Sequence, residues 1–395
     1  MATKNIVLCI DGTWNAPMPL EDTNVLKLYE WSLVPNDGAG PQQVCCYLPG
    51  VGEDMRHVKA TVNSRVVHRQ TSAGRVADWF RQKANALTGG VSGRGTAERI
   101  KVAYQFLCEN YVRGDRIYIF GFSRGAFAAR SLAGFVALVG VLLANRLDDL
   151  PEAYRLYELA RDEHQSWLKA HMQRLDMRTI ESQEEDSALP IHFLGVWDTV
   201  GALGLPRRLG KFTAKYTEYH QVDVPPNVFI ARHAMALHEL RPDFDLMLWS
   251  DLARHPNLRQ VWFPGDHADI GGGHWANESG YADEALHWMA GEAAGNGLRL
   301  NDKVPPRNSK ELHQQWLWFI LTNPTIRPEI RELPQVPGNA WHHATYCHPS
   351  LLWHLHHYGK SGYRFLNAGL NLKLKTVDGL ATQLLVRAKL HNLHP

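Results

Sequence analysis

Short runs of apolar residues recur along the first 273 residues, and each meets glycine, proline or aspartate at its end. The runs are nearly continuous in apolar side chains, which is typical of strands covered on both faces of a sheet. They span residues 5–10, 42–52, 116–123, 190–201 and 259–273. Stretches with helical spacing, such as residues 97–112, separate most of them. This alternation predicts an α/β fold, with a mostly parallel sheet flanked by helices.

Three segments interrupt the pattern with polar or charged sequence, and they span residues 53–96, 145–188 and 202–230. We expect them to be cap-like insertions over a site on the sheet. The last part of the chain reads first as helix and then as loop rich in His, Trp and Pro. We therefore expect a catalytic domain over residues 1–290 and a helical C-terminal region, residues 291–395, packed on that core.

The charge balance argues against one class of partner. The chain has 42 Lys and Arg against 40 Asp and Glu, a formal net charge of +2. Binding to a phosphate backbone needs a concentrated basic surface, so we do not expect nucleic acid as the partner.

Several features of the sequence favour a cytoplasmic location. The start, MATKNIVLCID, leads directly into a strand pattern and lacks the apolar segment of a signal peptide. No run of about 18 apolar residues is present, and the longest candidate, residues 132–144, has the length of a core helix. The five cysteines are odd in number, which favours a reducing compartment over a disulfide framework.

The stretch Gly121-Phe122-Ser123-Arg124-Gly125 matches G-x-S-x-G. An apolar run precedes it and small residues that tolerate a helix follow it, which is the strand–turn–helix context of a nucleophile elbow. The backbone N–H of Arg124, at the start of the helix, is then placed to donate to an oxyanion. The alternative is a serine that only caps the helix. We interpret Ser123 as the nucleophile.

A nucleophilic serine needs a base, and the base needs a group that orients it. Asp198 ends the run HFLGVWD, and His267 lies just past the run VWFPGDH. Both follow strands, where ligand sites form in open α/β sheets. Ser123, Asp198 and His267 are thus a candidate triad in the order Ser, Asp, His. Asp266 and Asp269 remain rivals for the acid, and Asp269 could instead hold the glycines that follow it.

Asp11, Gly12 and Thr13 end the first predicted strand. The backbone of Gly12 and Thr13 suits the second half of an oxyanion hole. Asp11 either braces this loop or approaches the triad as an alternative acid; a plain Asp-Gly turn is the simpler explanation. A phosphatase that uses a strand ending in Asp-x-Asp-Gly-Thr is disfavoured, because Cys9 occupies the position of the phosphate-accepting aspartate.

A cluster of histidines with Cys347 lies between His342 and His357. Their spacing fits no compact set of metal ligands, so a packing surface is the better interpretation. We expect neither a metal nor a cofactor.

The motifs VLCIDGTWN, YLPGVG, GFSRGAFAARSLAGFV, FLGVWDTVGALGLP, RHAMALHELRPDF and VWFPGDHADIGGG occur in this order over about residues 5–290. Together they resemble the α/β-hydrolase family of uncharacterised function that includes type VI secretion phospholipase effectors. The later HPSLLWHL is similar to that family's C-terminal segment. The resemblance implies an α/β-hydrolase fold, with Ser123, Asp198 and His267 at the positions of the family's motifs.

The resemblance further implies phospholipase A activity on membrane lipids, delivery to another cell by type VI secretion, and a secretion or immunity protein as partner. The family segment HALALDERR, a helix, reads HAMALHELR here, so His238 replaces an acidic residue.

We expect a serine-dependent ester hydrolase, a phospholipase or lipase, that acts on a lipid or acyl ester and contacts a membrane surface. A soluble carboxylesterase or thioesterase would use the same three residues. A non-catalytic binding or assembly module on a hydrolase fold is the alternative from another class.

Overall fold

The computed structural model describes about half of the chain, and every statement below concerns these residues. They are residues 3–13, 22–38, 40–51, 55, 58–62, 65–68, 94–159, 179, 191–201, 223–241, 244–249, 255–274, 279–301, 345–351, 354 and 389–390.

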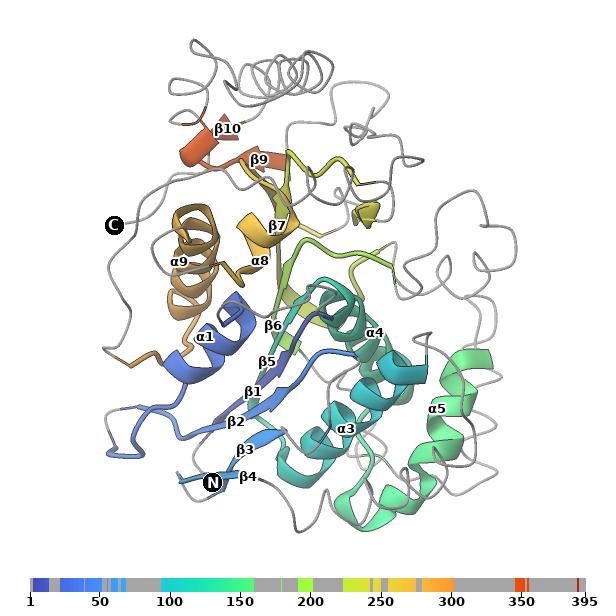
Figure 1. Cartoon of the computed structure of the whole chain (residues 1–395). Helices are drawn as coiled ribbons and strands as arrows, with labels where there is room; N and C mark the ends of the chain where they lie inside the picture. Colours follow the sequence, from blue (N-terminus) through green and yellow to red (C-terminus); the bar gives the residue numbers. More distant parts are fainter. Residues whose placement is uncertain are drawn as a thin grey trace.

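One sheet runs through the described residues, with the strand order β10-β9-β8-β7-β6-β5-β1-β2-β3-β4 (Figure 1). Neighbouring strands are parallel from β10 to β2, and a β3–β4 hairpin continues the sheet antiparallel to β2. The strands are β1 (Asn5–Ile10), β2 (Gln43–Leu48), β3 (Lys59–Val62), β4 (Arg65–His68), β5 (Arg116–Phe122), β6 (Ile191–Trp197), β7 (Val228–Ala236), β8 (Leu258–Phe263), β9 (Thr345–Cys347) and β10 (Lys389–Leu390).

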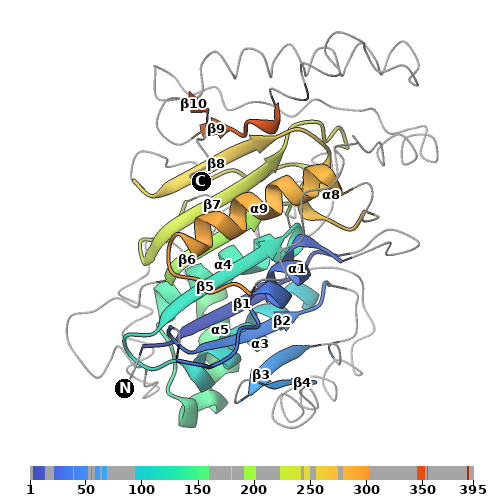
Figure 2. The same cartoon turned by 90° about the vertical axis from the view of Figure 1, so that its left-hand side faces the viewer.

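Helices cover both faces of this sheet. Figure 2 shows α1, α8 and α9 on the near side, with α3, α4 and α5 behind the strands. The helices are α1 (Asn24–Trp31), α3 (Arg94–Asn110), α4 (Arg124–Val139), the 3₁₀ helix η2 (Ala144–Asp149), α5 (Leu150–Leu159), α8 (His267–Gly271) and α9 (Gly280–Ala294). The predicted α/β-hydrolase-like fold, a mostly parallel sheet between two helical layers, is confirmed.

The core explains why the strand sequences lack polar alternation. Successive side chains of a strand point to opposite faces. In β1, Ile6, Leu8 and Ile10 pack into the cluster under α3 and α4, whereas Val7 and Cys9 pack into the cluster under α1 and α9. Both sets are fully buried, so every position is apolar. Burial of each large side chain contributes about 2 kcal/mol to folding.

The predicted apolar runs correspond to β1, β2, β5, β6 and β8, which are the inner strands of the parallel sheet. One prediction is wrong: the segment HAMALHELR, residues 233–241, is not helical. Its first residues belong to β7, a strand of nine residues that pairs in parallel with both β6 and β8. His238 follows the end of this strand. Ala234, Met235 and Ala236 of this segment are fully buried within the sheet.

The predicted insertions lie mostly outside the described residues. The described part of 53–96 includes the β3–β4 hairpin, and that of 145–188 includes η2 and α5. On α5, Tyr154 and Tyr157 pack on Phe135 of α4. Beyond residue 301, the described residues add β9 and β10 to the sheet. A cap over the site and a separate C-terminal region stay predictions.

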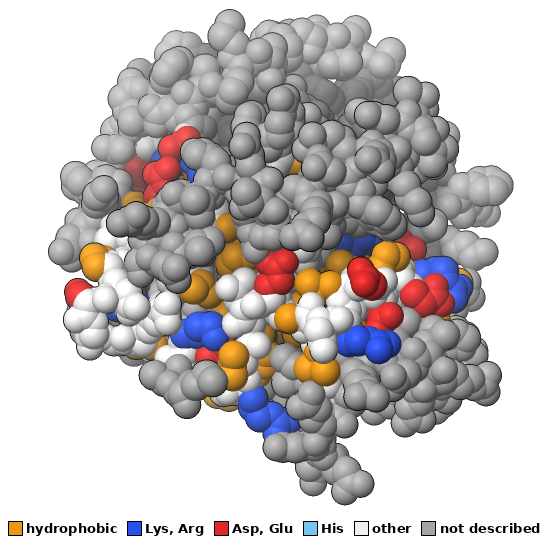
Figure 3. Space-filling view, turned by 90° about the horizontal axis from the view of Figure 1, so that it is seen from below, with side chains coloured by type: hydrophobic (Ala, Val, Ile, Leu, Met, Phe, Trp, Pro, Cys, Tyr) orange, Lys and Arg blue, Asp and Glu red, His pale blue; other side chains and the backbone are white. Residues whose placement is uncertain are grey.

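The surface agrees with the charge balance of the sequence. In Figure 3, acidic, basic and apolar side chains are interspersed over the described part of one face. No helix in the described part of the chain is both long and apolar enough to cross a membrane.

The topology also fixes where a site can form. Because β1, β5, β6 and β8 run parallel, their carboxyl ends lie at the same edge of the sheet. The loops after these four strands carry Gly12, Ser123, Asp198 and His267.

Candidate active site

Ser123 sits on a strained turn between β5 and α4. Its φ of 58° and ψ of −125° define a backbone conformation that residues other than glycine rarely adopt. The Ser123 N–H donates to the Trp197 carbonyl of the adjacent strand, at 3.0 Å. A Cβ atom built on Gly125 would lie 2.2 Å from the Ile10 carbonyl oxygen, so only glycine allows this close approach. The predicted strand–turn–helix context of G-x-S-x-G is present.

The Ser123 side chain bonds to a histidine and does not cap its helix. It lies at the N-cap position of α4 but makes no cap hydrogen bond. Its Oγ is 2.8 Å from Nε2 of His267. His267 Nδ1 is in turn 2.6 Å from Oδ2 of Asp198. The structure thus brings Ser123, His267 and Asp198 into one hydrogen-bonded chain, although 144 residues separate the serine from the histidine.

Each member of this chain is held by its surroundings. Asp198 directly follows β6 and has a φ of 38°. Its second carboxylate oxygen, Oδ1, accepts the Ala236 N–H at the end of β7. The His267 ring contacts two aromatic rings, those of Phe122 and Phe244, with centroids 4.6 and 4.7 Å away. These contacts fix the imidazole between the carboxylate and the hydroxyl.

The electrostatics favour a neutral imidazole. Burial lowers the pKa of His267, and the hydrogen bond and charge of Asp198 act in the opposite direction without cancelling the effect. The net direction is downward, so His267 is able to accept a proton at neutral pH.

A short helix, α8, presents His267 as its first residue. Asp266 is its N-cap, and its Oδ1 accepts the N–H groups of Ala268 and Asp269. Asp269 completes a capping box by accepting the Asp266 N–H. The two aspartates that rivalled Asp198 are therefore engaged in building the helix, whereas Asp198 is bonded to the imidazole.

Two further residues, which the sequence did not single out, support α8. The His267 N–H donates to Oε2 of Glu239, at 3.2 Å. Glu239 also accepts two hydrogen bonds from the guanidinium of Arg241. The guanidinium lies over the ring of Phe244, which flanks His267. The only sequence signal is a charged pair just after the buried strand β7.

Asp11 braces the first loop. Its carboxylate accepts hydrogen bonds from the Gly12 N–H, the Thr23 hydroxyl and the Tyr47 hydroxyl. Of the two predicted roles, bracing is the one that these bonds describe.

The braced loop lies against the nucleophile. A Cβ atom built on Gly12 would be 3.0 Å from Cβ of Ser123. The Thr13 hydroxyl is buried and has no hydrogen-bond partner. Gly12 thus lies beside Ser123, and Arg124 follows Ser123 as the first residue of α4. The oxyanion hole formed by Gly12, Thr13 and Arg124 stays a prediction.

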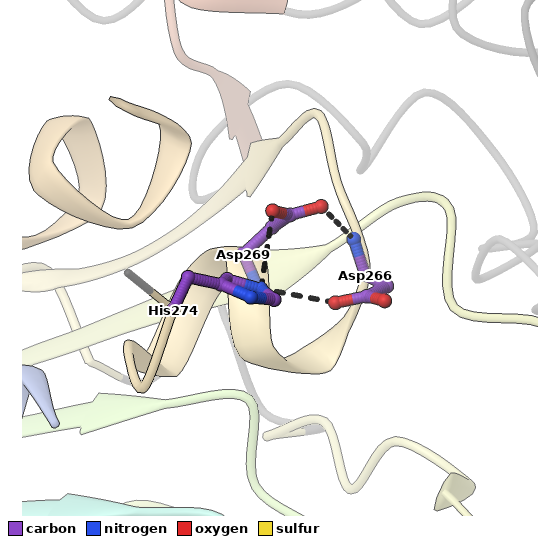
Figure 4. Close-up of side chains that lie close together, drawn as sticks. All are labelled: Asp266, Asp269 and His274. Atoms are coloured by element: carbon purple, nitrogen blue, oxygen red, sulfur yellow. Dashed lines mark hydrogen bonds and ion pairs between the residues drawn. The ribbon is translucent and has the colours of Figure 1, made fainter. Parts of the chain in front are cut away.

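Asp266, Asp269 and His274 form a compact buried group beside the site (Figure 4). Each offers one ligand atom, and these atoms lie within 4.8 Å of one another. The capping bonds of the two aspartates already account for their position. Burial and the neighbouring Asp269 carboxylate raise the pKa of Asp266 to about 8. With this raised pKa, Asp266 carries a proton at neutral pH, which reduces the repulsion between the two carboxyl groups.

Replacing Asp266 by asparagine is expected to alter the pH dependence of stability. Because the folded-state pKa is raised, ionisation of Asp266 opposes folding: the stability present at low pH is lost as pH rises toward about 8. Asp266→Asn keeps the N-cap acceptor and cannot ionise. We expect the melting temperature of the variant relative to wild type to rise between about pH 4 and about pH 8, the unfolded-state and folded-state pKa values of Asp266, and to level off above pH 8. A constant difference across this range would contradict the assignment.

The described part of the C-terminal histidine cluster makes packing contacts. His348 stacks on Phe263 and shares a hydrogen bond with Ser350. His354 bonds to the hydroxyl of Tyr281. The remaining histidines of the cluster lie outside the described residues.

The fold and the site together define an α/β-hydrolase-like protein with a serine on a strained turn between a strand and a helix. The chain belongs to a family described as "T6SS, Phospholipase effector Tle1-like, catalytic domain", which matches residues 4–292. The family resemblance noted in the sequence is thereby confirmed.

Similar proteins include one from yeast and two of solved structure. An uncharacterized protein of Saccharomyces cerevisiae is 31% identical over 258 residues, which cover 65% of this chain and 34% of the relative. The chain thus spans about a third of the length of that relative. The structure of an uncharacterized protein from Pseudomonas aeruginosa matches with 18% identity and a TM-score of 0.38; the match covers 76% of this chain and 46% of that protein's chain. The structure of the Tle1 effector bound to the VgrG spike from the type 6 secretion system matches with 15% identity and a TM-score of 0.38; the match covers 85% of this chain and 82% of that chain.

Proposed function

We propose that the protein is a serine-dependent ester hydrolase that releases fatty acid from phospholipids, a phospholipase A. The observation that carries the proposal is the continuous hydrogen-bonded chain from Asp198 through His267 to Ser123. Membership of a family of phospholipase effector domains supports phospholipid as the substrate class.

Each residue then has a definite task. Ser123 Oγ attacks the acyl carbonyl carbon while His267 Nε2 accepts its proton. Asp198 keeps the imidazole in the tautomer that accepts at Nε2 and stabilises the imidazolium that forms. The backbone N–H groups of Arg124 and of the Gly12–Thr13 loop stabilise the negative oxygen. His267 returns the proton to the departing alcohol. Water then attacks the acyl-enzyme while His267 accepts its proton, and the proton passes to Ser123 Oγ as the fatty acid leaves.

Two other functions are distinguishable by experiment. A carboxylesterase or thioesterase would use the same three residues on a soluble substrate. A binding or assembly module would not need the hydroxyl, imidazole and carboxylate aligned, so their alignment favours an enzyme.

We also propose that the protein acts in a target cell after type VI secretion, with a secretion or immunity protein as its partner. Family membership supports this part of the proposal.

The test is a comparison of substrates under the same conditions. Purified full-length protein is incubated with phosphatidylglycerol vesicles, with short-chain p-nitrophenyl esters and with acyl thioesters. Mass spectrometry then identifies free fatty acid and lysophospholipid. We expect phospholipid hydrolysis to be the fastest. Faster hydrolysis of the soluble esters would favour a carboxylesterase, and no hydrolysis of any substrate would favour a binding module.

The pH profile is expected to reflect the His267 environment. Protonated His267 cannot act as base, so kcat/KM falls on the acid side of its pKa. Because burial lowers that pKa, the acid limb should lie below about pH 6.5, the ordinary value for histidine. A profile of kcat/KM from pH 4 to pH 9, at about half-unit steps, measures it. An acid limb above pH 7 would contradict the assigned environment of the base.

A further inference from the structure

One buried arginine differs from the others in the described part of the chain. Four arginines there are exposed to no more than 9%: Arg99, Arg124, Arg130 and Arg232. Arg99 and Arg130 donate to backbone carbonyl oxygens, and Arg232 donates to the Glu292 carboxylate. Within that same part, Arg124 makes no hydrogen bond, ion pair or ring contact. Its side chain is the one unmatched buried cation of this set.

Such a cation is costly to keep. Removing a guanidinium from water is unfavourable unless acceptors replace the lost hydration. Burial accordingly lowers the pKa of Arg124, and no neighbouring carboxylate offsets the effect. The nitrogen atoms are nevertheless not among the fully buried polar atoms, so a ligand can reach them. An unmatched, reachable cation is typical of a site that is completed by an anion.

The position of Arg124 indicates which anion this is. It directly follows Ser123 and begins α4, a helix of 16 residues whose N-cap hydroxyl is directed to His267 and not to the helix N–H groups. The Thr13 hydroxyl, one residue after the Gly12 that lies beside Ser123, is also buried and lacks a partner. The acyl oxyanion needs only the backbone N–H groups. The guanidinium is therefore available to bind a second negative group of the substrate. Its planar set of N–H donors suits the oxygens of a phosphate.

We propose that the Arg124 guanidinium binds the phosphodiester of a glycerophospholipid while Ser123 attacks one of its acyl esters. This inference rests on the proposed function and adds the residue that selects phospholipids over neutral lipids. In a glycerophospholipid only a few bonds of the glycerol backbone separate the phosphate from the ester carbonyls. A side chain next to the nucleophile therefore matches the substrate. In an acyl-coenzyme A the long pantetheine arm separates them, which disfavours that source of phosphate.

The first experiment compares substrates that differ only in the phosphate. A short-chain phosphatidylcholine, kept below its micelle concentration, is compared with a diacylglycerol of the same acyl chains. Monomeric substrates remove any effect of surface charge. We expect Arg124→Gln to lower kcat/KM for the phospholipid at least about tenfold more than for the diacylglycerol, the loss of a charge-assisted hydrogen bond. Equal losses on the two substrates would overturn the proposal.

Two additional arms identify the source of the effect. Arg155→Gln is the matched control, because Arg155 is exposed on α5 and paired with Glu152. It should leave both activities unchanged. Acyl-coenzyme A of the same chain length tests the other phosphate donor. If Arg124→Gln reduces hydrolysis of the thioester selectively and not of the phospholipid, the anchor serves coenzyme A and the proposal is wrong.

The second experiment measures binding without catalysis. Full-length Ser123→Ala protein is titrated by calorimetry with sn-glycero-3-phosphocholine, the deacylated head group. We expect binding that weakens at least about tenfold in Ser123→Ala with Arg124→Gln. Binding that is unchanged by the second substitution, or no binding at all, would overturn the anchor. If the head group binds through Arg124 but wild type hydrolyses no ester, the proposed hydrolase activity has failed and the anion site has not.

Discussion

Ser123→Ala is expected to lower kcat by about a million-fold, the loss found when the nucleophile of a serine triad is removed. The expectation follows from the geometry. The hydroxyl is held by a strained turn at 2.8 Å from the base, and alanine leaves no oxygen to form the acyl-enzyme. Stability should change little, because alanine keeps the Cβ atom and the same strained backbone. Rates on the preferred ester and a melting curve measure both quantities.

A covalent probe makes this prediction independent of the substrate. A fluorophosphonate should label wild type at Ser123 and leave Ser123→Ala unlabelled. Ser131→Ala is a matched control, since Ser131 lies on the same helix α4, is buried, and should not affect labelling. Equal labelling of wild type and Ser123→Ala, with the site mapped by peptide mass spectrometry, would show that another residue is the nucleophile.

The sequence was sufficient to predict the elbow and the inner sheet because both depend on local patterns. Ser123 follows an apolar run, and two glycines flank it at positions where a Cβ atom would meet backbone atoms. The strands β1, β5, β6 and β8 are apolar at most positions because both faces are covered. Their parallel pairing then follows from the intervening helices.

Elements that depend on tertiary pairing were not predictable in the same way. β7 contains Ala, His and Met residues that are compatible with a helix, and its partners β6 and β8 determine that it is a strand. β9 and β10 are too short to give a pattern, and they exist by pairing with the sheet edge. The ion pair of Glu239 and Arg241 supports α8 through contacts that no spacing rule indicates.

The identity of the acid shows the same limit most clearly. Asp11, Asp198, Asp266 and Asp269 all follow apolar strand runs in the sequence, so sequence position does not separate them. Their hydrogen bonds do. Asp11 accepts hydrogen bonds from the hydroxyls of Thr23 and Tyr47. Asp266 and Asp269 cap α8, whereas Asp198 bonds to Nδ1 of His267. The choice is decided by side-chain direction, which only the folded chain defines.

Asp198→Asn is therefore expected to lower kcat by about ten-thousand-fold, as the same change does in a serine triad when the imidazole is held in the wrong tautomer. Asparagine can still accept the Ala236 N–H at Oδ1. Its amide would then donate to Nδ1 of His267, which leaves the proton on Nε2 and removes the acceptor that Ser123 needs. Rates on the preferred ester, with circular dichroism to verify folding, measure the effect.

The variant also has a signature that simple damage to the fold would not produce. Asp198 raises the pKa of His267 by its hydrogen bond and its charge, so their loss should move the acid limb of kcat/KM to lower pH. Asp269→Asn is the matched control, because it removes another buried carboxylate near His267 without touching the Asp198–His267 bond. A larger loss of kcat in Asp269→Asn than in Asp198→Asn would transfer the role of acid to Asp269.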